Sequence, residues 1–323
     1  MPIGEIISLM SYSVVVSLRE VLEAALIIGI IAGYLTKIDR RDLYRDVILG
    51  TVAAIAFSIG MAIVFLTAFE GLEEYQALFE GAVMILAAGV LTWMILWMAR
   101  ESRGIRSEFE EKVDRAITNQ EKAGIVLLVF FSVAREGAEL VLFLYASYVG
   151  NVEPVGLFES LIGIALGFLT GLGLAIILAL ILYNSTRQLN LRAFFNVTSL
   201  LLIVFAAGLL AHGIHEIYEF LEDSGSGLAT LFVWTEVWNI NQTPLGDILS
   251  VLFGWSYDLV YPGRFEKSIV GSILVGLFGW NDNPALIEVV AYAGYYLLIF
   301  LAIKMIKPVK QGTTPDVPAG LSS

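Results

Sequence analysis

The chain has 323 residues, of which 58% are hydrophobic and 15% charged, and its mean hydropathy is +0.80. This composition is typical of a polytopic membrane protein and excludes an ordinary soluble domain. The net charge of −12 argues against nucleic acid as a partner and is compatible with cations. Because the sequence has no cysteine, thiolate ligands, disulfides and thiol redox chemistry are excluded. A metal would have to be held by oxygen ligands or imidazole.

Apolar runs of about 20 residues or more are candidates for transmembrane helices. The sequence contains seven such runs, at residues 7–36, 46–69, 77–99, 123–149, 156–183, 194–220 and 285–306. We therefore predict an all-α membrane protein with seven transmembrane helices. Fifteen of the 19 Lys and Arg residues lie in connections or the tail on one side, and two lie on the other. The basic side is expected to be cytoplasmic, which places the N-terminus outside and the C-terminus inside.

The predicted transmembrane domain covers residues 1–306, and its first run is expected to be a retained helix rather than a cleaved signal. The charged connection 101–122 has a helical pattern that predicts an amphipathic cytoplasmic helix. An outer loop is expected at 222–284, with an interfacial or re-entrant piece at 268–280. Residues 307–323 are expected to form a disordered cytoplasmic tail.

Three charged residues interrupt the first apolar run. Arg19, Glu20 and Glu23 form an RExxE pattern, and each charge costs roughly 2.5–3.5 kcal/mol at the centre of a bilayer. Helical geometry lowers this cost, because Arg19 and Glu23 are i,i+4 neighbours. The motif begins about 12 residues into its run, or roughly 18 Å, which is near the middle of a ~30 Å hydrocarbon core.

The same pattern occurs again in the fourth run, as Arg135, Glu136 and Glu139. If the two helices meet, four carboxylates and two guanidiniums would face one another, which suits a hard, highly charged cation. The arginines would keep the glutamates ionised while the site is empty. The alternative is a pair of salt bridges that fix helix registry. Because the costly motif occurs twice at equal depth, we favour a metal site.

An internal repeat relates residues 7–99 to residues 123–220. The two RExxE motifs correspond, and so do two Ala-Ala-Gly segments at 87–89 and 206–208. Two ladders of small residues also correspond and predict close helix packing: Gly50, Ala54, Ser58 and Ala62 match Gly163, Gly167, Gly171 and Ala175. Because each copy has three helices, the second copy must enter from the opposite side. This predicts a 3+3 inverted-topology repeat plus a final helix, with transport by rocking of the two halves.

A second polar cluster is expected at the outer helix ends. Its better candidates as metal ligands are Glu80, His212, His215 and Glu216, and Glu70, Glu73, Glu74 and Glu219 flank them. They could form an acidic vestibule that gathers cations, although solvated helix ends remain an alternative for Glu70, Glu73 and Glu74. We attribute the recurrence of Trp93, Met94, Trp97 and Met98 to packing and interface anchoring. The sequence contains no HExxH, P-loop or GxSxG motif, and we predict no catalytic or cofactor-binding residues.

The paired motifs resemble those of the oxidase-dependent iron permease family, which includes fungal high-affinity ferric permeases and bacterial Efe-type uptake permeases. The resemblance extends over about residues 8–306 and includes Phe79-Glu80-Gly81 and the segment 91–98. One departure is Val21-Leu22, where Gly-Leu is usual in the family. The resemblance implies a multi-pass protein of the cytoplasmic membrane and a separate extracytoplasmic oxidase.

We therefore expect a permease, not an enzyme, that imports Fe³⁺ as its substrate and needs no cofactor. The expected ligands are Glu20, Glu23, Glu136 and Glu139, with Arg19 and Arg135 as supporting charges. Another cation, such as Pb²⁺, Mn²⁺ or Fe²⁺, stays open, and so does an intramembrane metalloenzyme. Expected partners are the iron ion, the lipid bilayer and the oxidase; a homo-oligomer also stays open.

Overall fold

The structure is a computed structural model that describes residues 3–67, 75–101, 105–118, 123–155, 157–184, 191–224 and 286–305, together with Leu274 and Pro284. The predicted tail 307–323 and the residues Glu70, Glu73 and Glu74 lie outside this part of the chain. So does most of the predicted outer loop 222–284.

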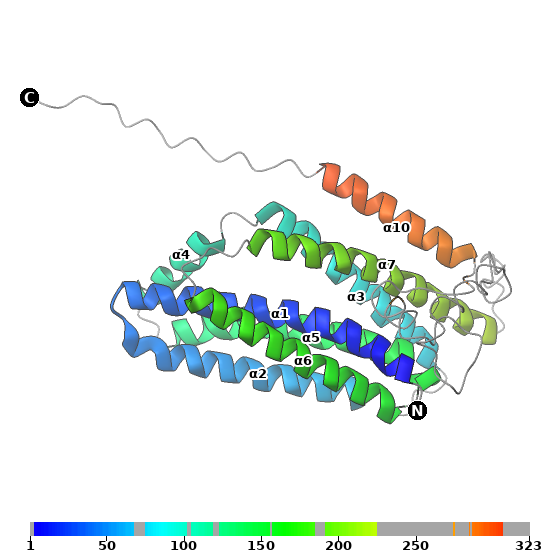
Figure 1. The fold of residues 1–323 in the computed structure, drawn as a ribbon, viewed down its shortest axis with the longest axis horizontal. Coiled ribbons are helices and arrows are strands. Elements are labelled where there is room, and N and C mark those ends of the chain that lie inside the picture. The colour runs from blue at the N-terminus through cyan, green and yellow to red at the C-terminus, as the bar shows by residue number, and fades with distance from the viewer. Residues whose placement is uncertain are drawn as a thin grey trace, which may run out of the picture.

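Every regular element in the described ranges is helical, which confirms the all-α part of the predicted fold class (Figure 1). All seven apolar runs coincide with long helices, and the charged connection forms the predicted amphipathic helix. The elements are α1 (Ile3–Lys37), a short 3-10 helix η1 (Arg41–Leu43), α2 (Tyr44–Thr67), α3 (Gln76–Glu101), α4 (Ile105–Thr118), α5 (Gly124–Val155), α6 (Leu157–Asn184), α7 (Leu191–Asp223) and α10 (Leu286–Met305).

Among the residues that the structure describes, five segments are long and apolar enough to cross a membrane, as expected for a multi-pass membrane protein. They are Arg41–Thr67, Gln76–Trp97, Phe158–Ile181, Thr198–Leu221 and Leu286–Met305. The two helices that carry the charged motifs, α1 and α5, are not among these five. Both are nevertheless long, with 35 and 32 residues, and at ~1.5 Å per residue each exceeds a ~30 Å hydrocarbon core. Seven crossings and their orientation therefore remain a prediction.

The end of α1 shows how the sequence sets a helix boundary. Asp39 adopts a left-handed conformation with φ of 58°. The N–H of Arg40 then donates to the carbonyl of Leu35 at 2.8 Å, and the N–H of Asp39 donates to Thr36 at 3.2 Å. This pair of bonds is a Schellman motif, which satisfies carbonyls that the helix leaves open. The chain turns here and returns as α2.

Helix pairing follows the small-residue ladders. The most extensive contacts join α1 to α6, α3 to α7 and α2 to α5. A Cβ built on Gly167 of α6 would lie 2.6 Å from the carbonyl oxygen of Met10 in α1. A Cβ on Gly50 of α2 would lie 2.6 Å from the carbonyl oxygen of Val126 in α5. Both helix pairs therefore pack backbone against backbone, which confirms the close packing predicted for the ladders.

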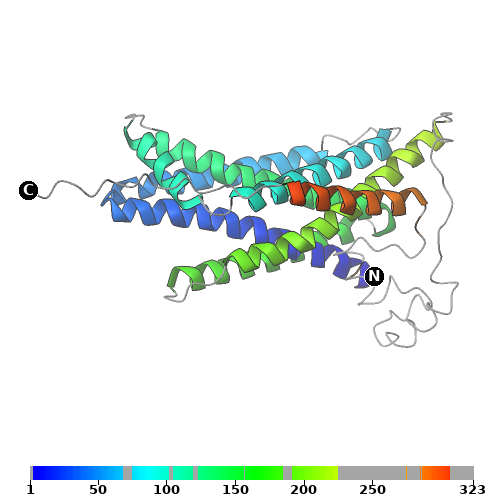
Figure 2. The same ribbon diagram turned by 90° about the horizontal axis from the view of Figure 1, so that it is seen from above.

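This pairing forms two groups of helices (Figures 1 and 2). The helices α1, α2, α5 and α6 form one group, and α3, α7 and α10 lie along its side. Each group combines helices from both sequence halves, 7–99 and 123–220. The expected rocking of one half against the other would have to separate the glycine contacts between α1 and α6 and between α2 and α5, and it stays a prediction.

A shared apolar core joins the two groups. Tyr12 of α1 stacks on Phe205 of α7 with ring centroids 3.6 Å apart. Both residues belong to a buried cluster that also includes side chains from α3, α5 and α10. A second cluster, at the other end of α1, packs α4 against α1, α2 and α5. There the Tyr34 hydroxyl donates to Asp114 Oδ1 of α4 at 2.7 Å. The charged motifs lie on α1 and α5 between these two apolar regions.

Candidate metal site

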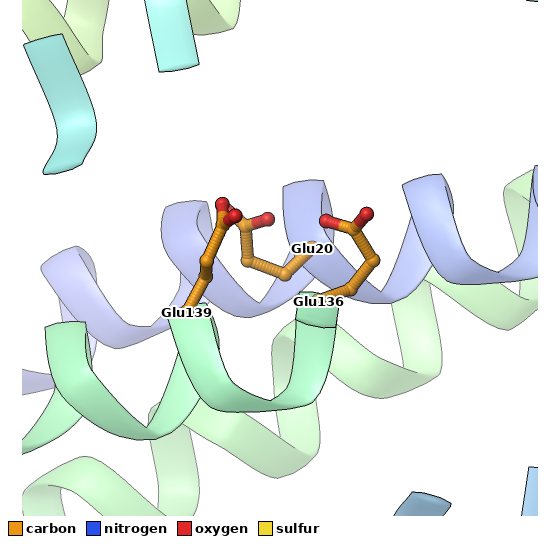
Figure 3. A group of neighbouring side chains, drawn as sticks. All are labelled: Glu20, Glu136 and Glu139. Carbon is orange, nitrogen blue, oxygen red and sulfur yellow. The ribbon is translucent and has the colours of Figure 1, made fainter. Parts of the chain in front are cut away.

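Three glutamates from the two RExxE motifs converge between α1 and α5. Glu20, Glu136 and Glu139 each offer one carboxylate oxygen, and these oxygens lie within 4.8 Å of one another. The three side chains are 1%, 6% and 7% exposed. Figure 3 shows Glu20 extending from α1 and the other two from α5, with their carboxylates directed toward one another. Of the residues that the structure describes, no other group of three acidic or histidine ligands lies this close together.

Each of the three carboxylates keeps an oxygen for a further ligand. The Oε2 atoms of Glu20, Glu136 and Glu139 are buried and have no hydrogen-bond partner among the described residues. Leaving a buried charged oxygen without a partner is costly. A multivalent cation bound between these oxygens would remove that cost, and hard cations prefer such carboxylate ligands.

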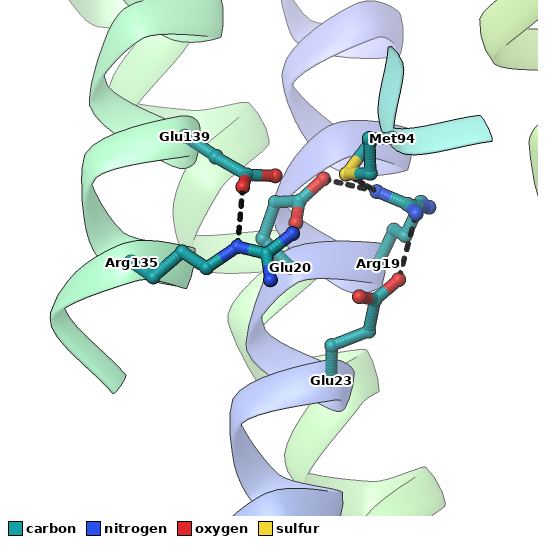
Figure 4. Close-up of polar contacts among 6 residues, drawn as sticks. All are labelled: Arg19, Glu20, Glu23, Met94, Arg135 and Glu139. Carbon is teal, nitrogen blue, oxygen red and sulfur yellow. Dashed lines mark hydrogen bonds and ion pairs between the residues drawn. The ribbon is translucent and has the colours of Figure 1, made fainter. Parts of the chain in front are cut away.

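Arg19 supports this group from a fully buried position. Its Nη1 lies 2.6 Å from Glu20 Oε1, and its Nη2 lies 2.8 Å from Glu23 Oε1. Nη1 also lies 3.0 Å from the sulfur of Met94 on α3. Arg19 is 0% exposed, so it bridges the two α1 glutamates from within the protein (Figure 4). Glu23 was predicted as a fourth ligand; it lies next to the converging group through Arg19, but it is not one of its three members.

Arg135 has different surroundings. Its Nε donates to Glu139 Oε1 at 3.0 Å (Figure 4). Its guanidinium carbon lies 5.3 Å from the ring centroid of Trp93 and 5.0 Å from that of Trp97, both on α3. The Arg135 side chain is 38% exposed, in contrast to Arg19. The two motif arginines are therefore related in sequence but not in environment.

The predicted outer ligands lie apart from the three converging carboxylates. Glu80 is buried at the start of α3, where it accepts a hydrogen bond from Gln76 Nε2 at 3.0 Å. His215 Nδ1 lies 3.2 Å from Glu288 Oε1 of α10. His212 lies on an exposed part of α7, with its ring centroid 6.5 Å from that of His215.

Glu216, the last of the four predicted outer ligands, lies where α3 crosses α7. A Cβ built on Gly81 of α3 would be 3.2 Å from the Cβ of Glu216. The outer residues thus share the α3–α7–α10 group of helices. Their role in gathering cations remains a prediction.

Two sets of contacts were missed from the sequence. Glu288 is 5% exposed and pairs with His215, although we did not select it as a candidate. Its signal was present, because a lone carboxylate in an apolar run of transmembrane length is itself costly. Trp93, Met94 and Trp97 were attributed to packing and interface anchoring, and that interpretation was incomplete, because all three contact motif arginines. Nothing in their spacing identifies those partners. The side chain of Met98 lies outside the described part of the chain.

Comparison with known proteins identifies the family. The family model described as "Iron permease FTR1 family" matches residues 10–308, which include both motifs. The chain belongs to the FTR1 family of iron permeases. The chain is 35% identical over 300 residues to a protein of Escherichia coli O6:H1 named "Ferrous iron permease EfeU", and the alignment covers 92% of this chain and 95% of that protein.

Other relatives of the chain align over similar lengths. A Yersinia pestis protein with the same name is 33% identical over 282 residues, covering 86% of this chain and 88% of the relative. An uncharacterized Archaeoglobus fulgidus protein is 38% identical over 282 residues, covering 87% and 90%. No solved structure matches the chain. The resemblance found in the paired motifs is thus confirmed over nearly the whole length.

Proposed function

We propose that this FTR1-family permease imports iron across the cytoplasmic membrane through a site formed by Glu20, Glu136 and Glu139, with Glu23 as a fourth carboxylate nearby. The convergence of three buried carboxylates from two separate helices carries this proposal. A structural salt bridge would need one carboxylate per arginine. This arrangement has two carboxylates per arginine, and three carboxylate oxygens lack a hydrogen-bond partner in the described structure.

The charge balance favours a trivalent ion. If all are ionised, the four glutamates and two arginines of the motifs carry a net charge of −2. Oxygen ligands and a high local negative charge suit a hard cation such as Fe³⁺. An inside-negative membrane potential assists import by roughly 2.3 kcal/mol per charge for each 100 mV. For Fe³⁺ this amounts to about 7 kcal/mol at 100 mV.

We propose that α1–α3 and α5–α7 form an inverted repeat. Exchanging α1, α2 and α3 for α5, α6 and α7 converts the α1–α6 contact into the α5–α2 contact, and it leaves the α3–α7 and α1–α5 pairs unchanged. The observed helix pairs agree with that symmetry. Because α1, α2, α5 and α6 form one group, we assign alternating access to movement of this group against α3, α7 and α10.

Ferrous iron is a second candidate substrate, because the Escherichia coli and Yersinia pestis relatives are named ferrous iron permeases. An oxidase outside the membrane would reconcile the two candidates. It would convert supplied Fe²⁺ into the Fe³⁺ that the carboxylates prefer. The oxidase would be a separate protein.

Uptake of radioactive iron into proteoliposomes tests these proposals. Vesicles containing the purified chain, with an imposed inside-negative potential, receive either Fe³⁺-citrate or ascorbate-reduced Fe²⁺. We expect Fe³⁺ uptake that falls to the level of empty vesicles in Glu20→Gln and Glu139→Gln. Glu111→Gln is the matched control, because Glu111 is exposed on α4, where it pairs with Arg115. Wild-type rates in the Glu20 and Glu139 variants would refute the site, and uptake of Fe²⁺ alone would refute the ferric assignment.

A further inference from the structure

We propose that Trp93 and Trp97 of α3 are positioning residues that hold the guanidinium of Arg135 as a displaceable counter-cation of the iron site. This inference rests on the proposed function. It gives the two arginines of the repeated motif different roles. Arg19 is a fixed part of the site, whereas Arg135 leaves Glu139 when the metal binds and stays on the tryptophan rings.

The contacts of Arg19 leave it no second position. It is 0% exposed, it pairs with two carboxylates of its own helix, and the Met94 sulfur lies 3.0 Å from its Nη1. Moving this guanidinium would leave Glu20 buried at 1% exposure without its cation. Removing one partner of a buried pair is among the most destabilising changes in proteins. Arg19 therefore stays in place in both the empty and the loaded site.

Arg135 has a second set of contacts available. Within the described structure it pairs with Glu139, and it lies 5.3 and 5.0 Å from the ring centroids of Trp93 and Trp97. Both distances lie within the ~6 Å range over which an aromatic face attracts a cation. The Arg135 side chain is 38% exposed and that of Trp93 is 56% exposed, so the guanidinium is not enclosed. It can leave the carboxylate without breaking the surrounding packing.

Metal binding favours such a displacement. Glu139 Oε1 accepts from Arg135, while Oε2 of the same carboxylate has no hydrogen-bond partner among the described residues. A trivalent ion between the carboxylates repels the guanidinium, and arginine cannot relieve the repulsion by losing its proton. Two aromatic faces, four residues apart on one helix, keep the displaced cation stabilised. Because Trp93 and Trp97 lie on α3, outside the four-helix group that carries the carboxylates, the contact that retains Arg135 joins the two groups of helices.

The test is a thermodynamic cycle on metal affinity. Binding of Ga³⁺, a trivalent ion that is not reduced, is measured by calorimetry on purified protein, with Ga³⁺ supplied as citrate. We expect Trp93→Leu/Trp97→Leu to bind Ga³⁺ about tenfold more weakly, the combined effect of two partly exposed cation–π contacts. Trp93→Phe/Trp97→Phe keeps an aromatic face at both positions, so it should bind Ga³⁺ with an affinity closer to that of the wild type. The same Leu pair in an Arg135→Gln background should change the affinity less than twofold. Phe131→Leu, an exposed aromatic of α5, is the packing control.

The proposal would be overturned if Trp93→Leu/Trp97→Leu weakened Ga³⁺ binding equally in the wild-type and Arg135→Gln backgrounds, or weakened it in neither. Both outcomes would leave the carboxylate site standing. If the wild-type chain bound no Ga³⁺, the carboxylate site itself would be refuted. A second measurement does not depend on the Leu variants. Ga³⁺ should change the tryptophan fluorescence of the wild type, and this change should be lost in Trp93→Phe/Trp97→Phe and in Arg135→Gln. If Ga³⁺ changed the fluorescence of either variant as much as that of the wild type, displacement of Arg135 would be contradicted.

Discussion

Replacing Gly171 by alanine should separate α6 from α1 and weaken both stability and transport. A Cβ at position 171 would lie 2.6 Å from the carbonyl oxygen of Val14 and 2.8 Å from the Cβ of Ser17. Contact at about 3.5 Å is the closest that is not repulsive. The helices must therefore move apart locally by about 0.7–0.9 Å. The neighbouring atoms belong to the backbone or a Cβ, so side-chain rotation cannot absorb the clash.

The magnitude follows from two opposing effects. Overpacking costs about 1–3 kcal/mol, whereas replacing glycine by alanine within a helix contributes up to about 1 kcal/mol of stability. We expect Gly171→Ala to lower the free energy of unfolding by about 1–2 kcal/mol. Ser17 is two residues before Arg19 and three before Glu20, so the displacement reaches the site. Ligand positions must hold to about 0.5 Å, and we expect iron uptake to fall at least about tenfold.

Gly173 provides the matched control on the same helix. No atom lies within 4 Å of a Cβ built there. Gly173→Ala should therefore leave uptake unchanged and raise stability by up to about 1 kcal/mol. Stability is measured by SDS titration of the protein in mixed micelles, with helix content followed by circular dichroism. Equal stability and equal uptake in the two alanine variants would refute the proposed close contact of α1 with α6.

Three further substitutions test the burial of Arg19 and the docking of α4. Arg19→Gln should lower the free energy of unfolding by about 3–5 kcal/mol, because it leaves buried carboxylates without their cation. Arg40→Gln removes an exposed ion pair and should cost less than about 1 kcal/mol; similar losses in both, measured by the same titration, would contradict the burial of Arg19. Tyr34→Phe removes the hydrogen bond to Asp114 and should destabilise the docking of α4 by about 0.5–1.5 kcal/mol. Faster amide exchange in α4 would support this, whereas unchanged exchange would show that the hydrogen bond does not hold α4.

The division into two groups of helices changes how the paired motifs are understood. The motifs lie in different sequence halves, yet α1 and α5 belong to the same group and contact each other directly. The proposed metal ligands would therefore stay together in the movement that we propose for this group. The motif arginines contact the other group of helices through α3. Met94 of α3 contacts Arg19, and Trp97 of α3 contacts Arg135.

The sequence by itself determined what depends on neighbours along the chain. The seven apolar runs predicted the long helices, and the charged connection predicted α4. The i,i+4 spacing predicted the pairing of Arg19 with Glu23 and of Arg135 with Glu139, because a helix brings such residues together wherever it lies. The glycine spacing likewise showed which helix faces pack closely, since a missing Cβ is a local property.

Only the tertiary structure decided which helices those faces meet. Partners far apart in the chain depend on the helix arrangement, and apolar helices of similar composition allow several arrangements. The structure therefore decided that α1 packs on α6 rather than within its own half. It also decided that Glu20 joins the converging carboxylates while Glu23 stays beside Arg19. The same holds for His215 and Glu288, which lie 73 residues apart and pair because α10 lies beside α7.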